Sequence, residues 1–358
     1  MNPHDFAPPF PRRPDRGIGL VGCGWVAGMQ LEAYRAAGFT VVALVDHDAA
    51  KAEALRDAHY PDAVVHRDVE SLLADEAVEV VDVATHVGGR SAIIESALRS
   101  GRPVLTQKPF VEDLDEGERL AALATELGRP LAVNHNGRWA PHFAVLLATA
   151  RNGVLGAVTS ADFSVSWPHH QVVADMPAFA NMEDLVLYDF GIHWFDVIAA
   201  LVDQDPLQVF AQVGRRPGQG IGAPTQAQVV IAYPDVQVSL VLRAAEPRAE
   251  VGAYRVSGTA ATLVHEGTSL GGEAVRIVTG EGEEQRTETV AIGADWFGPG
   301  MAGTMGELLL ALDEGRPPVN DARSSLRGLS LCFAAVESAR TGVPVVPGSV
   351  RRRPVGAA

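Results

Sequence analysis

Two short stretches carry side chains whose types and spacing could do chemistry. Lys108 stands in the run T-Q-K-P, and its ammonium could polarise a carbonyl or lower the pKa of a neighbouring acid by its charge. Asp189 and His193 lie four residues apart, so on an α-helix they share one face, and a histidine held near a carboxylate can act as general acid and base near neutral pH. The plainer interpretations are a surface Lys108, a helix-capping Asp189 and a core His193.

Two further polar stretches could line a pocket. The run N-H-N-G-R-W, residues 134–139, leaves a predicted strand, so Asn134 could reach a bound ligand, and Arg138 could contact substrate or form an ion pair between domains. Trp167 and His169 lie in a predicted loop, residues 167–170, that either covers the pocket or is simply exposed. No metal site is expected, because Asp189 and His193 lack a third ligand.

A glycine-dense turn, I-G-L-V-G-C-G-W-V-A-G at residues 18–28, joins an apolar run to a helical period. That order seats a dinucleotide pyrophosphate on a helix N-terminus. Gly22 would make the tight turn, Gly24 would let the backbone approach phosphate, and Ala27 would allow close packing of helix on strand. A register that starts five residues earlier follows P-R-R-P-D-R, which cannot form a buried strand.

The next apolar run, residues 41–45, ends in Asp46. An acid about 20 residues beyond the glycine turn can accept hydrogen bonds from the ribose hydroxyls of NAD. No arginine follows at once to hold a 2′-phosphate. The sequence therefore predicts a cofactor site that favours NAD over NADP.

Composition bounds the protein class. A length of 358 residues predicts two domains, and a net charge of −15 argues against nucleic acid or an anionic membrane as the partner. Two cysteines make a disulfide framework improbable. No segment is apolar and long enough to span a bilayer, and no secretory signal is visible. We expect a cytoplasmic protein with a mobile proline-rich arm over residues 1–15.

The first half of the chain alternates strand and helix patterns. This rhythm predicts a parallel, doubly wound sheet. The expected strands are residues 18–21, 41–45, 63–65, 78–84, 104–106 and 131–133. The expected helices are residues 26–37, 49–58, 69–74, 91–100 and 114–127.

The second half begins with an expected helix and then turns mainly to strands. Strands in succession with few helices predict one large, mostly antiparallel sheet. The expected strands are residues 157–166, 207–213, 226–233, 236–243, 253–256, 262–264, 274–278 and 288–292. The expected helices are residues 141–150, 189–202, 301–313 and 322–341. The predicted domains are residues 16–137 and 138–358, and the last helices could pack back on the first domain.

With these stretches in order, the chain resembles the Gfo/Idh/MocA family, that of glucose–fructose oxidoreductase and myo-inositol dehydrogenase, from about residue 17 to residue 346. The resemblance rests on the glycine turn, Asp46, the span from Thr85 to the Lys-Pro at Lys108, and the D-x-G-x-H motif of residues 189–193. The run A-V-E-S-A-R-T-G at residues 335–342 also looks like the family's closing helix.

The resemblance implies an α/β protein with a Rossmann domain and a C-terminal domain whose sheet forms a homodimer or homotetramer. It implies NAD(P)-dependent hydride transfer on a carbohydrate or polyol. His193 would take the hydroxyl proton, Lys108 would stabilise the hydroxyl oxygen, and Asp189 would orient His193 or a substrate hydroxyl. The expected cofactor-binding residues are Gly22, Gly24, Trp25, Val26, Ala27, Asp46, Thr85, His86, Lys108 and Asn134. The expected substrate-binding residues are Lys108, Arg138, Trp167, His169, Asp189 and His193.

The sequence also departs from the family pattern. Gln107 replaces the usual glutamate before Lys-Pro, and the T-P-N-x-x-H pattern becomes T-H-V-G-G-R, ending at Arg90. Gln30 stands where a histidine is common. Two alternatives to a dehydrogenase stay open: a lyase or glycosidase with a tightly bound NAD that is transiently reduced, and a non-catalytic NAD-binding protein, to which the altered motifs at Thr85 and Gln107 point.

Overall fold

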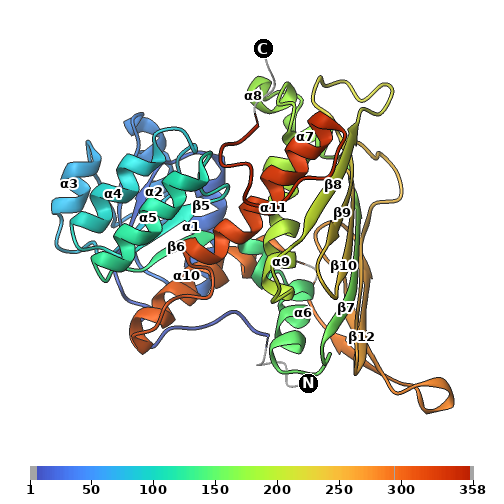
Figure 1. Cartoon of the computed structure of the whole chain (residues 1–358). Coiled ribbons are helices and arrows are strands. Elements are labelled where there is room, and N and C mark those ends of the chain that lie inside the picture. Colours follow the sequence, from blue (N-terminus) through green and yellow to red (C-terminus); the bar gives the residue numbers. More distant parts are fainter. Residues whose placement is uncertain (1–5, 294, 355–358) are drawn as a thin grey trace. The chain divides into compact units, whose positions relative to one another are not determined.

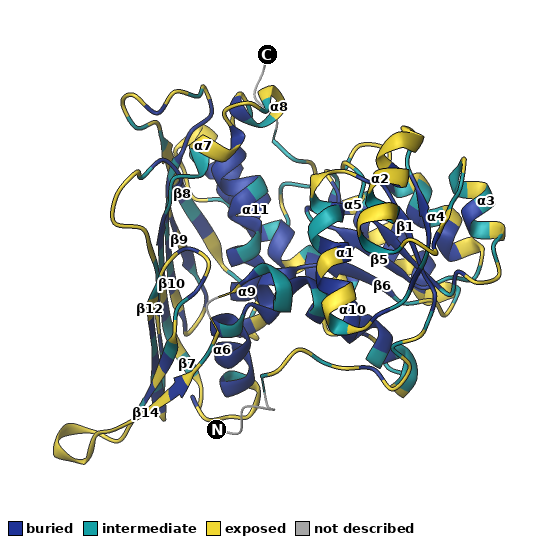
Figure 2. Cartoon of the chain, turned by 180° about the vertical axis from the view of Figure 1, so that it is seen from behind, coloured by how far each residue is buried: buried dark blue, intermediate teal, exposed yellow. Residues whose placement is uncertain are grey.

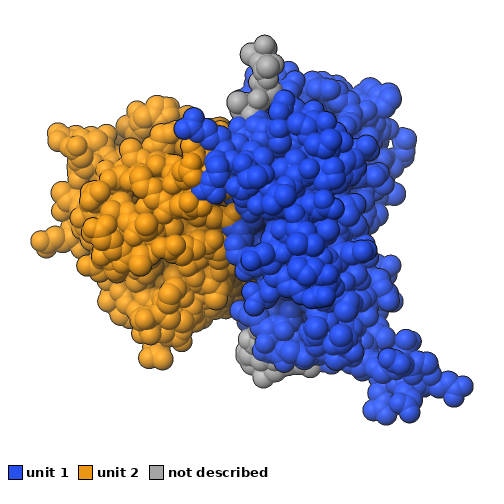
Figure 3. All heavy atoms as spheres, in the orientation of Figure 1, with its two compact units in different colours: residues 1–7, 140–296, 327–358 blue, residues 8–139, 297–326 orange. Residues whose placement is uncertain are grey.

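The computed structural model describes residues 6–293 and 295–354. The chain forms two compact units, coloured separately in Figure 3. The parallel-sheet unit comprises Pro8–Trp139 and Phe297–Leu326, and the antiparallel-sheet unit comprises Met1–Ala7, Ala140–Trp296 and Arg327–Ala358. Residues 1–5 of the predicted N-terminal arm lie outside the described residues.

The parallel-sheet unit is built on six parallel strands in the order β3-β2-β1-β4-β5-β6 (Figure 1). The predicted doubly wound sheet is thus confirmed. Its strands are β1 (Ile18–Val21), β2 (Val41–Val45), β3 (Val64–Val65), β4 (Val80–Val83), β5 (Val104–Gln107) and β6 (Leu131–Asn134). Its helices are α1 (Trp25–Ala37), α2 (Ala49–His59), α3 (Val69–Ala74), α4 (Arg90–Arg99), α5 (Leu114–Glu126), the 3₁₀ helix η2 (Asn136–Trp139) and α10 (Phe297–Glu314).

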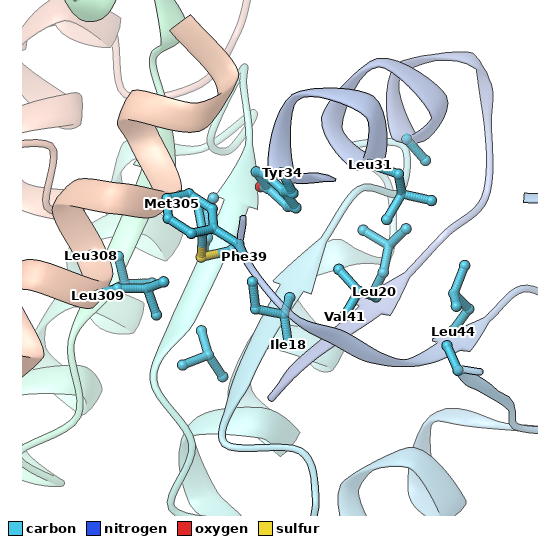
Figure 4. Close-up of a cluster of buried hydrophobic side chains, with 14 of the residues drawn as sticks. Ile18, Leu20, Leu31, Tyr34, Phe39, Val41, Leu44, Met305, Leu308 and Leu309 are labelled. Carbon is cyan, nitrogen blue, oxygen red and sulfur yellow. The ribbon is translucent and has the colours of Figure 1, made fainter. Parts of the chain in front are cut away.

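The core of this unit joins segments far apart in the sequence. Figure 4 shows Ile18 and Leu20 of β1 in one cluster of buried side chains with Met305 and Leu308 of α10. Helix α10 approaches closely, because the Cβ of a residue other than glycine at position 303 would lie 2.4 Å from the ring of Trp139. A late helix therefore completes a core that the first 139 residues begin.

The antiparallel-sheet unit contains an eight-stranded sheet in the order β14-β13-β12-β11-β7-β10-β9-β8. Among the described residues of this sheet, β7 and β10 pair in parallel and the other neighbouring strands pair antiparallel, so the predicted mostly antiparallel sheet is confirmed. Its strands are β7 (Val158–Ser166), β8 (Gln208–Gly214), β9 (Gln226–Ala232), β10 (Gln237–Arg243), β11 (Val251–Gly258), β12 (Ala261–Gly267), β13 (Ala274–Thr279) and β14 (Arg286–Ala291). Its helices include α6 (Pro141–Arg151), α9 (Ile192–Leu201) and α11 (Ala322–Thr341), which starts in the other unit.

The two faces of this sheet differ in polarity. Phe163 of β7 and Leu240 of β10 are buried, and the ring of Phe143 from α6 lies 6.2 Å from that of Phe163. Asp162, which precedes Phe163 in β7, and Arg255 of β11 are exposed. Helices α6 and α9 are largely buried (dark blue in Figure 2). The alternation typical of a half-buried sheet thus places the helices on one face.

The segment between β7 and α9 is more helical than the sequence indicates. His169 and His170 open a short helix, α7 (His169–Val173), rather than lying in a loop, and α8 (Pro177–Ala180) follows. Prolines at positions 168 and 177 fix backbone angles suited to a first helical turn. A π-helix, η3 (Val186–Phe190), then precedes α9, so the single helix expected over residues 189–202 is wrong in its first turn.

Asp82 in the middle of β4 is fully buried. Its Oδ2 accepts hydrogen bonds from Gln30 Nε2 at 2.7 Å and from the Tyr34 hydroxyl at 2.8 Å. Burial raises the pKa of Asp82 to about 7, although the hydrogen bonds from Tyr34 and Gln30 and the charge of Arg90 act in the opposite direction. Gln30 therefore serves as a donor to a carboxyl group in the core.

We expect Asp82 to make stability fall between about pH 4 and about pH 7. The folded protein keeps the Asp82 proton up to about pH 7, whereas the unfolded chain releases it near its ordinary pKa of 3.8, so rising pH favours unfolding across this window. At about 1.4 kcal/mol per tenfold change in proton affinity, the loss is on the order of 4 kcal/mol. Asp82→Asn has no such proton. In denaturant unfolding, its free energy of unfolding relative to that of wild type should therefore rise as the pH rises from about 4 to about 7. A pH-independent difference would contradict this expectation.

Candidate active site

The glycine turn follows β1 as its spacing predicts. Gly22 has a φ of +95°, and a Cβ there would lie 3.0 Å from the backbone of Ala84 and Thr85. A Cβ on Gly24 would meet nothing within 4 Å, so packing does not require this glycine and space for a ligand stays open above the backbone. Gly22 thus makes the turn, and Gly24 leaves the approach to it clear.

The first turn of α1 presents backbone N–H groups next to this space. Helix α1 begins at Trp25, one residue earlier than expected, and its N-cap Gly24 contributes no side-chain hydrogen bond. Trp25 is 64% exposed, whereas Ala27 is fully buried. A helix start without a side-chain cap is suited to an anionic ligand that accepts from its N–H groups. Val26 lies between these two residues and is half-buried.

Asp46, which follows β2, is tied to the glycine turn. Its Oδ2 accepts from the Cys23 N–H at 2.7 Å and its Oδ1 from the Asp48 N–H at 2.9 Å. Burial by itself would raise the pKa of Asp46, but these hydrogen bonds, with the nearby His47 and Lys51, lower it below its ordinary value. The carboxylate is therefore ionised at neutral pH and held beside the turn.

Parallel register brings several predicted site residues to one edge of the sheet. Val21 of β1 is opposite Val83 of β4, and Val83 is opposite Thr106 of β5. Further along the same edge, Gln107 is opposite Asn134. The glycine turn, Thr85, Lys108 and Asn134 therefore all stand at the carboxyl ends of neighbouring strands, where open α/β sheets bind ligands.

Two side chains at this edge, those of Thr85 and Gln107, carry buried polar atoms. Among the described residues, Thr85 Oγ1 and Gln107 Nε2 are buried and have no hydrogen-bond partner. The other polar atom of the Gln107 side chain, Oε1, accepts from the Lys108 N–H at 3.2 Å. Such atoms fit the contact surface of a polar ligand, while His86 beyond them is exposed.

Asn134 and Arg138 have structural partners within the parallel-sheet unit. Asn134 is fully buried, and its Oδ1 accepts from Thr304 Oγ1 at 3.1 Å. Arg138 donates from Nη1 to the Val319 carbonyl at 2.5 Å and from Nη2 to Ser324 Oγ at 3.1 Å. These contacts anchor α10 and the segment after it, and the ligand contacts expected of both residues stay predictions.

The D-x-G-x-H motif spans the junction of two kinds of helix. Asp189 lies in the π-helix and His193 in α9, and the Gly191 N–H donates to the Val186 carbonyl, five residues back, at 3.0 Å. A Cβ on Gly191 would lie 2.5 Å from the Leu187 carbonyl oxygen. The glycine of the motif is thus required by the π turn, a feature frequent at functional sites.

Aromatic rings surround this motif within the antiparallel-sheet unit. The His169 ring lies 3.8 Å from that of Phe190, and the Trp167 ring lies 5.4 Å from the same phenylalanine. His193 lies 5.7 Å from the ring of Trp296. The structure therefore gathers the predicted Trp167 and His169 beside the motif. Phe190 and Trp296 were not predicted, and for Trp296, a hundred residues downstream, no local signal existed.

The three residues expected to do chemistry come from both units: Lys108 belongs to the parallel-sheet unit, and Asp189 and His193 belong to the antiparallel-sheet unit. No group of three or more His, Cys, Asp and Glu side chains among the described residues could hold a metal ion. In the same part of the chain, no helix is both long and apolar enough to cross a membrane. The cytoplasmic location stays a prediction.

A six-stranded parallel sheet with a glycine turn after its first strand is the arrangement of a Rossmann nucleotide-binding domain, and a large antiparallel sheet accompanies it in this chain. The chain belongs to the Gfo/Idh/MocA family. Residues 16–135 match the family model described as oxidoreductase family, NAD-binding Rossmann fold, and residues 143–264 match the GFO/IDH/MocA C-terminal domain.

Curated relatives include sugar and polyol dehydrogenases. The chain is 30% identical over 179 residues to a D-apiose dehydrogenase of Paraburkholderia graminis, which covers 50% of this chain and 47% of the relative. It is 31% identical over 137 residues to a scyllo-inositol 2-dehydrogenase (NADP(+)) of Bacillus subtilis, covering 38% of each. The chain thus spans about half the length, or less, of these relatives.

Solved structures share the fold over nearly the whole chain. An oxidoreductase from Agrobacterium radiobacter in complex with NAD+, L-tartaric acid and magnesium has a TM-score of 0.80 at 21% identity and covers 94% of this chain and 99% of its own. A levoglucosan dehydrogenase in complex with NADH and levoglucosan has a TM-score of 0.78 at 17% identity, covering 94% and 100%.

We expect Gly22→Ala to weaken cofactor binding. The added Cβ would force the turn at positive φ away from Ala84 and Thr85, lowering stability by about 1–3 kcal/mol and NADH affinity by roughly tenfold or more. Gly38→Ala is the matched control, because Gly38 also has a positive φ, +75°, but no atom lies within 4 Å of its Cβ position. Gly38→Ala should lower the stability of the fold and leave NADH affinity unchanged. NADH fluorescence titration and thermal unfolding measure both, and equal NADH affinities for the two variants would refute the role of Gly22.

Proposed function

We propose that this protein is an NAD-dependent dehydrogenase that transfers hydride between a hydroxyl carbon of a sugar or polyol and nicotinamide. The observation that carries the proposal is the common carboxyl edge of β1, β4, β5 and β6, which aligns the glycine turn, Thr85, Lys108 and Asn134. The family match and the sugar and polyol dehydrogenases among the relatives support it.

The residues at this edge fit a dinucleotide. The Gly22 turn and the first turn of α1 suit a pyrophosphate. The ionised Asp46 suits ribose hydroxyls and would repel a 2′-phosphate, and His47 and Asp48 follow it in place of an arginine. We therefore favour NAD over NADP, and the named NADP relative makes this a choice to be measured.

Three side chains of the protein would share the proton transfer and the stabilisation of charge. A bound nicotinamide would supply the acceptor for the hydride that leaves the carbon bearing the hydroxyl. His193 would take the proton of that hydroxyl as general base, leaving a carbonyl group. The Lys108 ammonium would donate a hydrogen bond to the same oxygen and stabilise its developing negative charge. Asp189 would orient the His193 ring or hold a second hydroxyl of the substrate.

The aromatic surroundings of the D-x-G-x-H motif favour a carbohydrate or polyol substrate. Trp167 and His169 are only half-buried, while Phe190 behind them is buried. Aromatic faces next to a few polar groups suit a molecule with an apolar C–H face and several hydroxyls. Arg138 is also proposed for the substrate side on its position after β6.

The experiment that tests the proposal follows nicotinamide absorbance and fluorescence of purified protein with NAD or NADP and a panel of pentoses, hexoses and inositols. Free NADH accumulating with one substrate is expected. Tightly bound nicotinamide without net NADH would favour the lyase or glycosidase with transient redox. Failure to bind NAD and NADP would overturn the assignment of the glycine turn and Asp46.

We expect His193→Asn and Lys108→Met to lower kcat by about 10²- to 10⁴-fold while NADH affinity changes little, because each removes a group that acts on the substrate hydroxyl. His59→Asn is the matched control, since His59 ends α2 at the opposite edge of the parallel sheet. Its turnover should equal that of wild type. Full turnover by His193→Asn would show that another residue takes the proton.

We also propose a homodimer or homotetramer formed through the outer face of the antiparallel sheet. That face carries Val230, which is 53% exposed, beside the half-buried Phe210 and Val241. Exposed apolar side chains on a strand favour association. Val230→Lys should shift the mass from light scattering toward the monomer, whereas Val64→Lys on β3, where the valine is 51% exposed, should not. A wild-type monomer would refute the proposal.

A further inference from the structure

Arg90, the first residue of α4, is 3% exposed. Its Nη1 donates to the Gln107 carbonyl at 2.5 Å and to the Pro109 carbonyl at 2.6 Å. Its Nε donates to the Thr85 carbonyl at 3.2 Å, and Nη2 donates to the same oxygen. One guanidinium thus binds three backbone carbonyls, where the resembled family pattern has a histidine.

Two of these carbonyls belong to the residues on either side of Lys108 in the chain. Gln107 and Pro109 are its two neighbours in the chain, and Thr85 follows the adjacent strand β4. The pairing of β4 with β5 ends at Val83 and Thr106, so the backbone beyond that point has left the ladder between these strands. The Arg90 side chain continues the connection between the two strands past the end of their hydrogen-bonded ladder.

The arrangement depends on the planar fork of arginine. A guanidinium offers N–H donors in fixed directions, so it can hold several acceptors at once. A lysine at this position would keep the charge but present a single rotating ammonium. The Gln107 side chain also accepts from the Lys108 N–H, so the backbone of Lys108 has a hydrogen bond of its own beside those that Arg90 makes to its two neighbours.

We propose that Arg90 is a positioning residue that fixes the backbone of Lys108 at the carboxyl edge of the parallel sheet. This inference rests on the proposed function for the role of Lys108. Its effect on turnover would be indirect, through the placement of the Lys108 ammonium against the substrate oxygen. A displacement of about 1 Å in a positioned group can lower turnover by roughly 100-fold.

The chain supplies a matched control in Arg102. This half-buried arginine precedes β5 and donates to the carbonyls of Val78 at 3.1 Å, Ser100 at 2.9 Å and Asp75 at 3.1 Å. It therefore makes the same kind of three-carbonyl contact at the opposite end of the same strand. Arg102 should matter for stability, and it stands away from Lys108.

The test compares Arg90→Lys and Arg90→Ala with Arg102→Lys and Arg102→Ala in the full chain. The melting temperature should fall in both pairs of variants. Hydrogen exchange followed by mass spectrometry should accelerate at residues 106–111 in the Arg90 variants only. With a substrate from the panel, their kcat should fall by about 10- to 100-fold with KM nearly unchanged, while the Arg102 variants keep wild-type kcat.

The outcomes separate this inference from the proposed function. Wild-type exchange at residues 106–111 in Arg90→Lys would overturn it, and so would an equal loss of kcat in the Arg102 variants. If wild-type protein turns over no sugar or polyol, the proposed function fails, and hydrogen exchange still decides whether Arg90 fixes this backbone. Should Arg90→Ala not fold, Arg90→Lys decides the result.

Discussion

The parallel hydrogen-bond register of β1, β4, β5 and β6 is the constraint on which the rest of the candidate site depends. Because parallel strands run in one direction and their pairs are evenly spaced, the residues after Val21, Val83, Gln107 and Asn134 emerge at one edge. The segments at this edge include the glycine turn, Thr85, Lys108 and Asn134, so one edge collects the groups for a ligand. A slip in one pairing would move a whole set of side chains to the wrong face.

Close backbone approach is the second constraint, and glycines mark where it operates. Gly22 lets the turn after β1 pass within contact distance of Thr85, and Gly191 lets the π turn close on the Leu187 carbonyl. Gly303 admits α10 against Trp139. At each place a side chain would collide with backbone or an aromatic ring rather than with a flexible side-chain tip, so neighbouring structure has little room to adapt.

Buried polar groups then tune a framework that apolar packing builds. Asp82 keeps its proton to near neutrality because burial outweighs its hydrogen bonds, while hydrogen bonds from backbone N–H groups keep Asp46 ionised. The two carboxyl groups lie in the same unit and behave oppositely because one sits inside the sheet and the other at its edge. Hydrogen bonds likewise compensate the buried charge of Arg90, whose guanidinium donates to carbonyl oxygens at the ends of two strands.

Sequence by itself determined the two sheets, most strand positions and the glycine turn, because hydrophobic period, glycine placement and a terminal acid are local signals. The missed elements are short or rare: α7 has five residues, too few to show a helical period, and the π turn before Gly191 inserts a residue that no period reveals. The sequence offered that the last helices could pack back on the first domain, and the tertiary structure decided that α10 completes the core of the first sheet. Only the tertiary structure decided that Trp296 lies beside His193 and that Arg90 binds the Gln107 and Pro109 carbonyls. These contacts join residues far apart in the sequence or far from any motif, and a linear pattern cannot encode which distant surfaces meet.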